Sequence, residues 1–256
     1  MITRINLVKH GNVPKEFIDL VLSILRTFYT AVGANIPLVD LHVYETVISK
    51  RTYIELEGLR RGVSISGDFI VLHEAWSGIP RIHICYEELK DMDLSLIKAL
   101  IIHEAAHSVL HGSIIYYTIT PSLEVMELLG REKALVATYI VSTAVKDYEV
   151  TKFLIRHGYL PYVLIYVDYV VSGAKGLGSD FLSKLQLIKL VTPLVALKEV
   201  IGEDVLRYVK LLSDYVGGEL VNKVIEVLDN VLRSYGTLDE WVNGILKELI
   251  KLGILP

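Results

Sequence analysis

The first third of the chain mixes two hydrophobic periods. Apolar residues recur at helical spacing across Val13–Val32, which predicts an amphipathic helix. Leu38–Glu45 alternates between apolar and polar positions, as a half-buried strand does. Val63–Leu72 and Arg81–Tyr86 are rich in β-branched residues and are separated by glycine and proline, so we expect two further strands there.

Beyond this region the pattern is helical almost to the end of the chain. We expect one helix to begin at Asp93, a suitable N-cap, and to end near Gly112. A longer, largely apolar helix is expected over Glu132–Arg156. Glycine and proline then predict breaks between helices of ordinary length at Gly130, Gly158–Pro161, Gly173–Gly178, Gly202, Gly217–Gly218 and Gly236.

These elements predict an α+β fold, with a small mixed sheet in the N-terminal half and a mostly helical C-terminal half. We place a core domain at residues 1–157 and a helical bundle packed on it at residues 158–256, with one continuous domain as the alternative. A chain of 256 residues is long enough to bury a substantial core.

Composition narrows the environment. The hydrophobic content is 52% and the mean hydropathy is +0.45, so a membrane span must be considered. The longest stretch without Asp, Glu, Lys or Arg, Ala105–Leu123, contains two histidines, Gly112 and Pro121, which exclude it as a span. We therefore expect a soluble protein without a membrane span.

Other features of the composition favour the cytoplasm. No apolar signal region follows Met1, and Cys85 is the single cysteine, so no intrachain disulfide can form. The scarcity of Gln, Cys and Met is typical of thermophile proteins. The net charge of −4 and the absence of a Lys/Arg cluster argue against nucleic acid as a partner.

The chemistry is concentrated in the sequence His103-Glu104-Ala105-Ala106-His107, an HExxH motif inside the expected helix. Histidines four residues apart share one helix face, so both imidazoles can reach one zinc ion. Glu104 lies beside such an ion, where it can accept a proton from a water and return it to a leaving group. The motif therefore provides two metal ligands, His103 and His107, and one general base, Glu104.

A third ligand is required, and His111 is the first residue to consider. Along a straight helix His111 lies about 12 Å from His103, too far to share one ion. We expect it in the last turn of the helix, near the exposed carbonyls, with a possible role at the rim of the site.

Acidic residues on the long helix are better candidates. Asp147 has no obvious cation on its own face of the helix, whereas Glu149 has Lys152 and Arg156 within reach. A carboxylate in a buried helix needs a partner. We therefore favour Asp147 as the third ligand and keep Glu149 as the alternative.

HEAAH on one helix followed by an acidic residue on the next long helix resembles the zincin metallopeptidases. The likeness is greatest to the gluzincin- and aspzincin-like families, which use a carboxylate as third ligand. The segment Asp147–Thr151 fits their second-helix pattern loosely, since Asp replaces the commoner Glu and Thr151 stands where Asp or Asn is frequent. The resemblance covers roughly residues 79–157.

The resemblance also implies substrate contacts. The strand Pro80–Tyr86 is comparable to the zincin strand that borders the cleft and pairs with an extended peptide. Within it His83 alternates with its isoleucine neighbours and is expected in solvent. We interpret His73 as structural. An oxyanion donor is expected among Tyr148, His157 and Tyr159.

The sequence thus predicts a zinc-dependent metallopeptidase acting on a peptide or protein substrate. One alternative is a zinc hydrolase of a non-peptide amide, which the same ligands could support. Another is a non-enzymatic helical interaction protein with a structural or vestigial zinc site. Glu104 counts against that last interpretation, because a structural site needs no base and is usually closed by four protein ligands.

Overall fold

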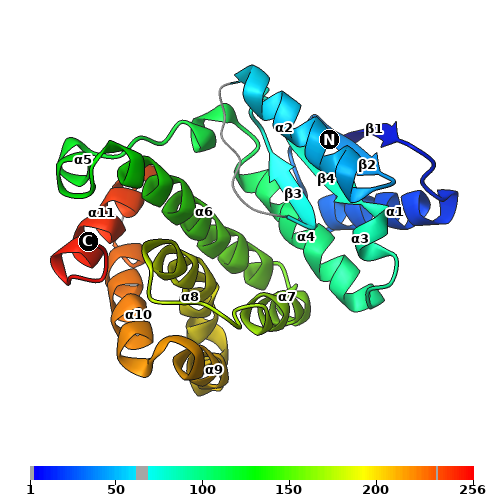
Figure 1. The fold of residues 1–256 in the computed structure, drawn as a ribbon. Helices are drawn as coiled ribbons and strands as arrows, with labels where there is room; N and C mark the ends of the chain where they lie inside the picture. The colour runs from blue at the N-terminus through cyan, green and yellow to red at the C-terminus, as the bar shows by residue number, and fades with distance from the viewer. Residues whose placement is uncertain (1–2, 62–68, 235) are drawn as a thin grey trace. The chain divides into compact units, whose positions relative to one another are not determined.

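The computed structural model describes residues 3–61, 69–234 and 236–256. The first part of the chain alternates strands and helices (Figure 1). Its elements are β1 (Arg4–His10), α1 (Lys15–Ala31), β2 (Leu38–Tyr44), α2 (Val47–Arg61), β3 (Val71–Glu74), β4 (Arg81–Cys85), α3 (Tyr86–Leu89), α4 (Leu94–Leu110) and the 3₁₀ helix η1 (Ile114–Tyr117).

The remaining elements are all helical, which confirms the predicted α+β class. They are α5 (Leu123–Leu129), α6 (Arg131–Arg156), α7 (Leu160–Ser172), α8 (Phe181–Ile201), the 3₁₀ helix η2 (Gly202–Val205), α9 (Leu206–Val216), α10 (Gly218–Leu232) and α11 (Leu238–Lys251). Most boundaries between these helices fall at or near the glycine-containing breaks predicted from the sequence, whereas η2 passes into α9 between Val205 and Leu206 without one.

By internal contacts the chain forms two compact units. The first comprises residues 1–117 and 157–166, and the second comprises residues 118–156 and 167–256. Helix α6 thus groups by its contacts with the later part of the chain, from residue 167 onward, whereas the boundary predicted from the sequence places it in the N-terminal domain. The domain boundary at residue 157 stays a prediction.

The sheet of the first unit has the strand order β1-β2-β4-β3. Strands β1, β2 and β4 are parallel, and β3 pairs antiparallel to β4. Because β4 has a ladder partner on each side, the expectation that an extended peptide pairs with the segment 80–86 is wrong. Among the described strands, β3 is the edge of the sheet on this side. Of the strand predicted over 63–72, positions 63–68 lie outside the described residues, and β3 extends two residues beyond its predicted end.

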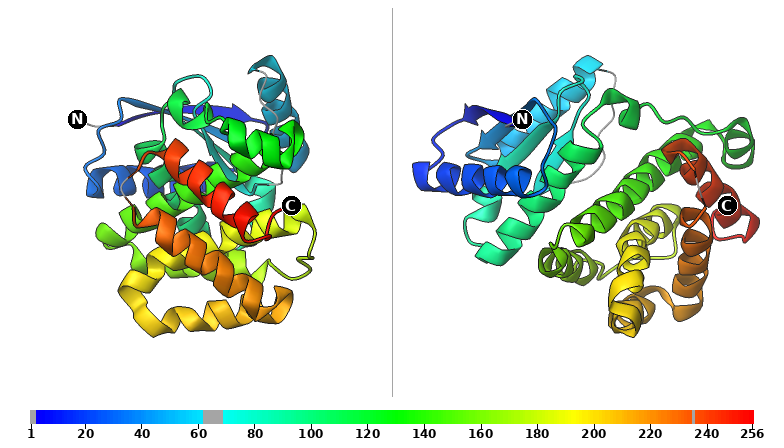
Figure 2. Two further views of the ribbon diagram at one scale, coloured as in Figure 1. Left: turned by 90° about the vertical axis from the view of Figure 1, so that its left-hand side faces the viewer. Right: turned by 180° about the vertical axis from the view of Figure 1, so that it is seen from behind.

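One face of the sheet is apolar and lies against the helix that carries the motif. Helix α4 contacts α1, β3 and β4. The residues that the two central strands, β2 and β4, place on this face are fully buried, and they are Val39, Leu41, Val43, Ile82 and Ile84. Each such aliphatic side chain stabilises the fold by about 1.5–3 kcal/mol relative to exposure. The apolar alternation of β2 and β4 therefore determines which side of the sheet receives α4, and the ribbon views show this helix lying along one side of the strands (Figure 2).

The opposite face, on which α2 packs, carries a histidine layer formed by His10, His42 and His83 together with Tyr44 and Tyr53. His42 and His83 are register partners on β2 and β4, with ring centroids 5.0 Å apart. His10 Nε2 lies 3.1 Å from His42 Nδ1. His83 exposes only 2% of its surface, so the prediction that it is solvated is wrong.

The histidine layer is neutral at pH 7. Burial, and then the neighbouring His83, lower the pKa of His10. The same two causes, followed by His10 and Arg81, lower the pKa of His42 to about 3. Glu74 lies 3.5 Å from His83 Nε2, and Tyr44 Oη lies 2.9 Å from His83 Nδ1. These contacts satisfy ring nitrogens that burial would otherwise leave unpaired.

In the second unit, α6 packs against α8 and α11. Small residues on α6, including Ala134, Ala137 and Ala144, are fully buried and let the neighbouring helices approach closely. Among the described residues, no helix is both long enough and apolar enough to cross a membrane.

Candidate metal centre

Helix α4 starts and stops where the sequence indicates. The Asp93 side chain accepts a hydrogen bond from the Ser95 backbone N–H at 2.8 Å, so it is the predicted N-cap. The helix ends at Leu110, and Gly112 stands two residues beyond. A Cβ at Gly112 would lie 2.6 Å from the Ser108 carbonyl oxygen and 3.1 Å from Pro80 Cγ. Close packing therefore requires glycine at this position. The backbone conformation does not, because the φ of Gly112 is outside the left-handed region.

A buried hydrogen bond fixes the rotation of α4 against α1. Ser108 donates its hydroxyl to the Ala105 carbonyl at 2.7 Å, and Tyr29 Oη lies 2.7 Å from Ser108 Oγ. Because the Ser108 proton is used within the helix, Tyr29 is the donor in the second bond. Burial raises the pKa of Tyr29, which keeps the phenol protonated. The face of α4 that carries the motif is thus held relative to α1.

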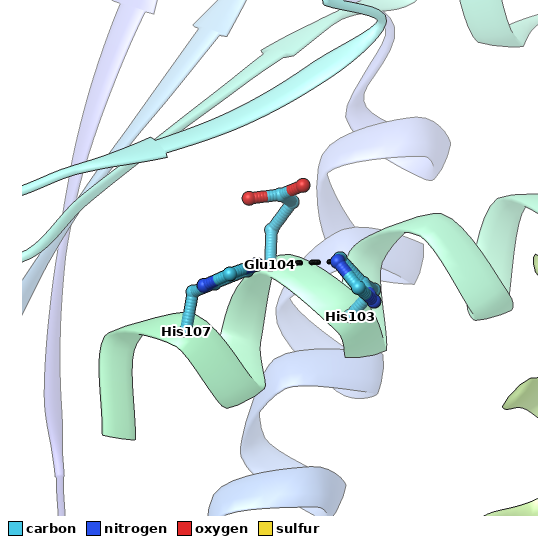
Figure 3. A group of neighbouring side chains, drawn as sticks. All are labelled: His103, Glu104 and His107. Carbon is cyan, nitrogen blue, oxygen red and sulfur yellow. Dashed lines mark hydrogen bonds between the residues drawn. The ribbon is translucent and has the colours of Figure 1, made fainter. Parts of the chain in front are cut away.

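The two motif histidines converge on one point. His103 Nε2 and His107 Nε2 are 3.2 Å apart, and both residues are buried (Figure 3). Two nitrogens bound at about 2.0–2.1 Å to one tetrahedral zinc ion are about 3.3 Å apart. Imidazole nitrogens are also a donor type that zinc favours. The separation of the two nitrogens therefore matches the spacing that one zinc ion would need.

Glu104 stands beside this pair and is oriented by the sheet. Its Oε2 accepts the backbone N–H of His73 on β3 at 2.9 Å. Its carboxylate extends from α4 toward the strands (Figure 3). Across residues 3–61, 69–234 and 236–256, the group of ligand-type side chains close enough to hold a metal is His103, Glu104 and His107, with ligand atoms within 4.8 Å of one another. The motif residues thus come together as predicted, with one carboxylate oxygen already held by β3.

Aromatic and histidine side chains surround the motif. Tyr166 of α7 stacks on His103, with ring centroids 3.8 Å apart and planes 13° apart. His73 stacks parallel to His107 at 6.0 Å, and its Nδ1 lies 3.0 Å from Tyr117 Oη. The sequence pattern does not point to Tyr166, and the interpretation of His73 as structural gave it no place at the site. The alternation of β3 and its pairing with β4 place His73 on the face toward α4.

His111 lies at the end of α4, as predicted, but it is buried with only 1% of its surface exposed. Its Nδ1 is 3.0 Å from His107 Nδ1, and its ring meets Tyr116 edge-on at 5.0 Å. It therefore contacts a predicted ligand through the ring nitrogen that faces away from His103.

The predicted third ligand, Asp147, and its alternative, Glu149, lie on α6 in the second unit. Asp147 exposes 5% of its surface, whereas Glu149 is half-buried. Lys152, proposed from the sequence as a partner of Glu149, pairs with Glu199 at 3.1 Å and lies 3.2 Å from Tyr148 Oη. Which carboxylate is the third ligand stays a prediction.

The three predicted oxyanion donors have different surroundings. Tyr148 is buried on α6. Tyr159 packs edge-on against Phe28, with ring centroids 5.3 Å apart, and is half-buried, whereas His157 is exposed. The choice among them remains open.

The chain matches no protein-family model, no curated protein and no solved structure.

Proposed function

We propose that the protein is a zinc-dependent peptidase in which His103 and His107 are metal ligands and Glu104 is the general base. The observation that carries this proposal is the convergence of two imidazole nitrogens at zinc spacing, 3.2 Å, next to a carboxylate held by a backbone amide. A structural metal site has no use for that carboxylate.

When bound, zinc would supply Lewis-acid chemistry, lowering the pKa of a water and polarising an amide carbonyl. Glu104 would take the proton of the attacking water and pass it to the departing amine. The His73 N–H donates to Oε2 of Glu104 at 2.9 Å. The same bond limits rotation of the carboxylate, and fixed geometry is a large part of general base catalysis.

For the third ligand we retain Asp147, with Glu149 as the alternative. Asp147 is the more buried of the two carboxylates, and a ligand shielded from solvent suits a site whose water access is controlled.

For the substrate we propose an extended peptide that pairs with β3 rather than β4. Strand β3 is the edge of the described sheet, and it carries His73 beside the motif. A peptide added to this edge would gain main-chain hydrogen bonds that are independent of its sequence. The cytoplasm is the proposed compartment, since Cys85 is a buried free thiol.

Zinc content measured by elemental analysis tests the proposal. We expect one zinc per wild-type chain, kept in Glu104→Gln and Glu149→Ala and lost in Asp147→Ala. Loss in Glu149→Ala instead would move the third ligand by two residues and preserve the mechanism. Absence of zinc from the folded, metal-supplemented wild type would refute the proposal that the protein is a zinc enzyme.

A peptide library incubated with the zinc-loaded protein then tests the reaction. Cleavage that disappears in Glu104→Gln supports the peptidase. Zinc binding without cleavage of any peptide, but with hydrolysis of small amides, would identify a non-peptide hydrolase instead.

A further inference from the structure

His111 occupies a position that the two-ligand motif does not explain. It is the C-cap of α4, and its backbone N–H bonds to the His107 carbonyl at 2.6 Å. At this residue the backbone leaves the helical conformation, with φ −123° and ψ 23°. Its buried ring lies beside the imidazole of His107, with the two Nδ1 atoms 3.0 Å apart.

The arrangement of protons between these two rings follows from the metal site. His107 directs Nε2 toward His103, so a metal shared by the pair would use that nitrogen. A neutral imidazole that binds metal through Nε2 carries its proton on Nδ1. Two Nδ1 lone pairs facing each other at 3.0 Å would repel, and a single proton between them makes a hydrogen bond. His107 is then the donor, and His111 is the acceptor with its own proton on Nε2.

We propose that His111 is a positioning residue, which fixes the tautomer and ring orientation of His107 without binding the metal itself. This inference rests on the proposed zinc site. Ligand histidines almost always donate their second ring nitrogen to a carboxylate, a carbonyl or water, and losing that acceptor typically weakens metal binding about 10–100-fold. Here the acceptor is a neutral imidazole, supplied by the residue that ends the same helix.

The local structure holds His111 in this role. Tyr116 of η1 meets the ring of His111 edge-on, at 73° between planes. Gly112 brings the following backbone close to Ser108 and Pro80, where any larger residue would clash. The H-x3-H-x3-H spacing therefore combines two proposed metal ligands, His103 and His107, with a hydrogen-bond acceptor for His107.

Zinc affinity measured by competition with a chromophoric chelator tests this role in wild type, His111→Phe and His111→Asn. Phenylalanine keeps the ring that contacts Tyr116 but has no acceptor, so we expect zinc binding to weaken about 10–100-fold. Asparagine places an amide oxygen near the position of Nδ1 and should restore most of the affinity. Thermal unfolding of the three metal-free proteins controls for folding, since a purely packing role would make Asn the more damaging change.

Long-range ¹⁵N–¹H correlation spectra of the zinc-loaded protein provide a second readout. We expect the Nε2–H tautomer at His111 and the Nδ1–H tautomer at His107. Wild-type affinity in His111→Phe, or the opposite pair of tautomers, would overturn the inference while leaving the zinc site intact. Absence of zinc binding by the wild type would overturn both. Zinc binding without peptide cleavage would refute only the peptidase, because the role of His111 is measured by affinity.

Discussion

At the scale of single residues, a change at Glu104 can distinguish the proposed catalysis from the proposed metal binding. Glutamine has nearly the same shape and can still accept the His73 N–H through its amide oxygen, but it cannot take a proton. We expect Glu104→Gln to retain zinc and to lower kcat about 10²–10⁴-fold, the usual contribution of a general base. Peptide hydrolysis followed by chromatography, with zinc content measured on the same sample, checks this. Full activity in the variant would mean that another group removes the proton.

Some residues of the candidate metal centre could be predicted from the sequence, and others could not. His103, Glu104 and His107 could be predicted because the helix alone brings them together, over one turn. His73 lies 31 residues before Glu104 and reaches it only because β3 is placed beside α4 by sheet pairing. Tyr166 reaches His103 from α7 in the same way, through packing. No spacing rule connects these residues to the motif, so only the folded structure could identify them.

At the scale of elements, the end of α4 is sensitive to a single methyl group. A Cβ at residue 112 would lie 2.6 Å from the Ser108 carbonyl oxygen, a backbone atom that cannot move independently of the helix. We expect Gly112→Ala to destabilise the protein by about 1–3 kcal/mol, the usual cost of overpacking. Chemical denaturation measures this, and Gly33→Ala is a poor control because its φ is positive. Gly173→Ala is better matched, since its nearest neighbour would lie at 3.4 Å. Equal stability losses in the two variants would contradict the packing argument.

Elements with a clear apolar period were predicted, whereas those without one were not. Helix α2 was missed because its buried residues are Lys50, Ile54 and Gly58, which form no apolar stripe. Strand β1 was missed because it is an edge of the described sheet and none of its residues is fully buried. The strand order was also beyond the local pattern. Strand β3 pairs antiparallel to β4 and lies next to it at the edge of the described sheet. The two strands have similar sequence patterns, so the patterns could not show which of them is the edge.

At the scale of the whole molecule, the histidine layer couples stability to pH. The pKa of His42 is lowered from 6.5 to about 3, chiefly by burial and then by His83, His10 and Arg81, while Glu57 of α2 opposes the shift. The unfolded chain therefore binds a proton at this position below pH 6.5, whereas the folded chain does not. The stability that depends on neutral His42 is fully present above pH 6.5 and is lost progressively as the pH falls toward 3.

Comparing wild type with His42→Gln isolates this effect from the other ionisable groups. Each histidine kept neutral by folding adds a slope of at most about 1.4 kcal/mol per pH unit to the free energy of unfolding. We expect the wild type to lose stability on acidification from about pH 6.5 to about pH 4.5 more steeply than the variant, by up to that slope. Glu57 contributes little in this window, because hydrogen bonds from Arg81 and Arg60 outweigh its burial and hold its pKa below the ordinary value of 4.5. Urea denaturation of the metal-free proteins at several pH values gives both slopes, and chelator removes any proton-linked metal binding from the comparison. Equal pH slopes of the free energy of unfolding in the two proteins would show that His42 is charged in the folded protein. That result would contradict a neutral histidine layer between α2 and the sheet.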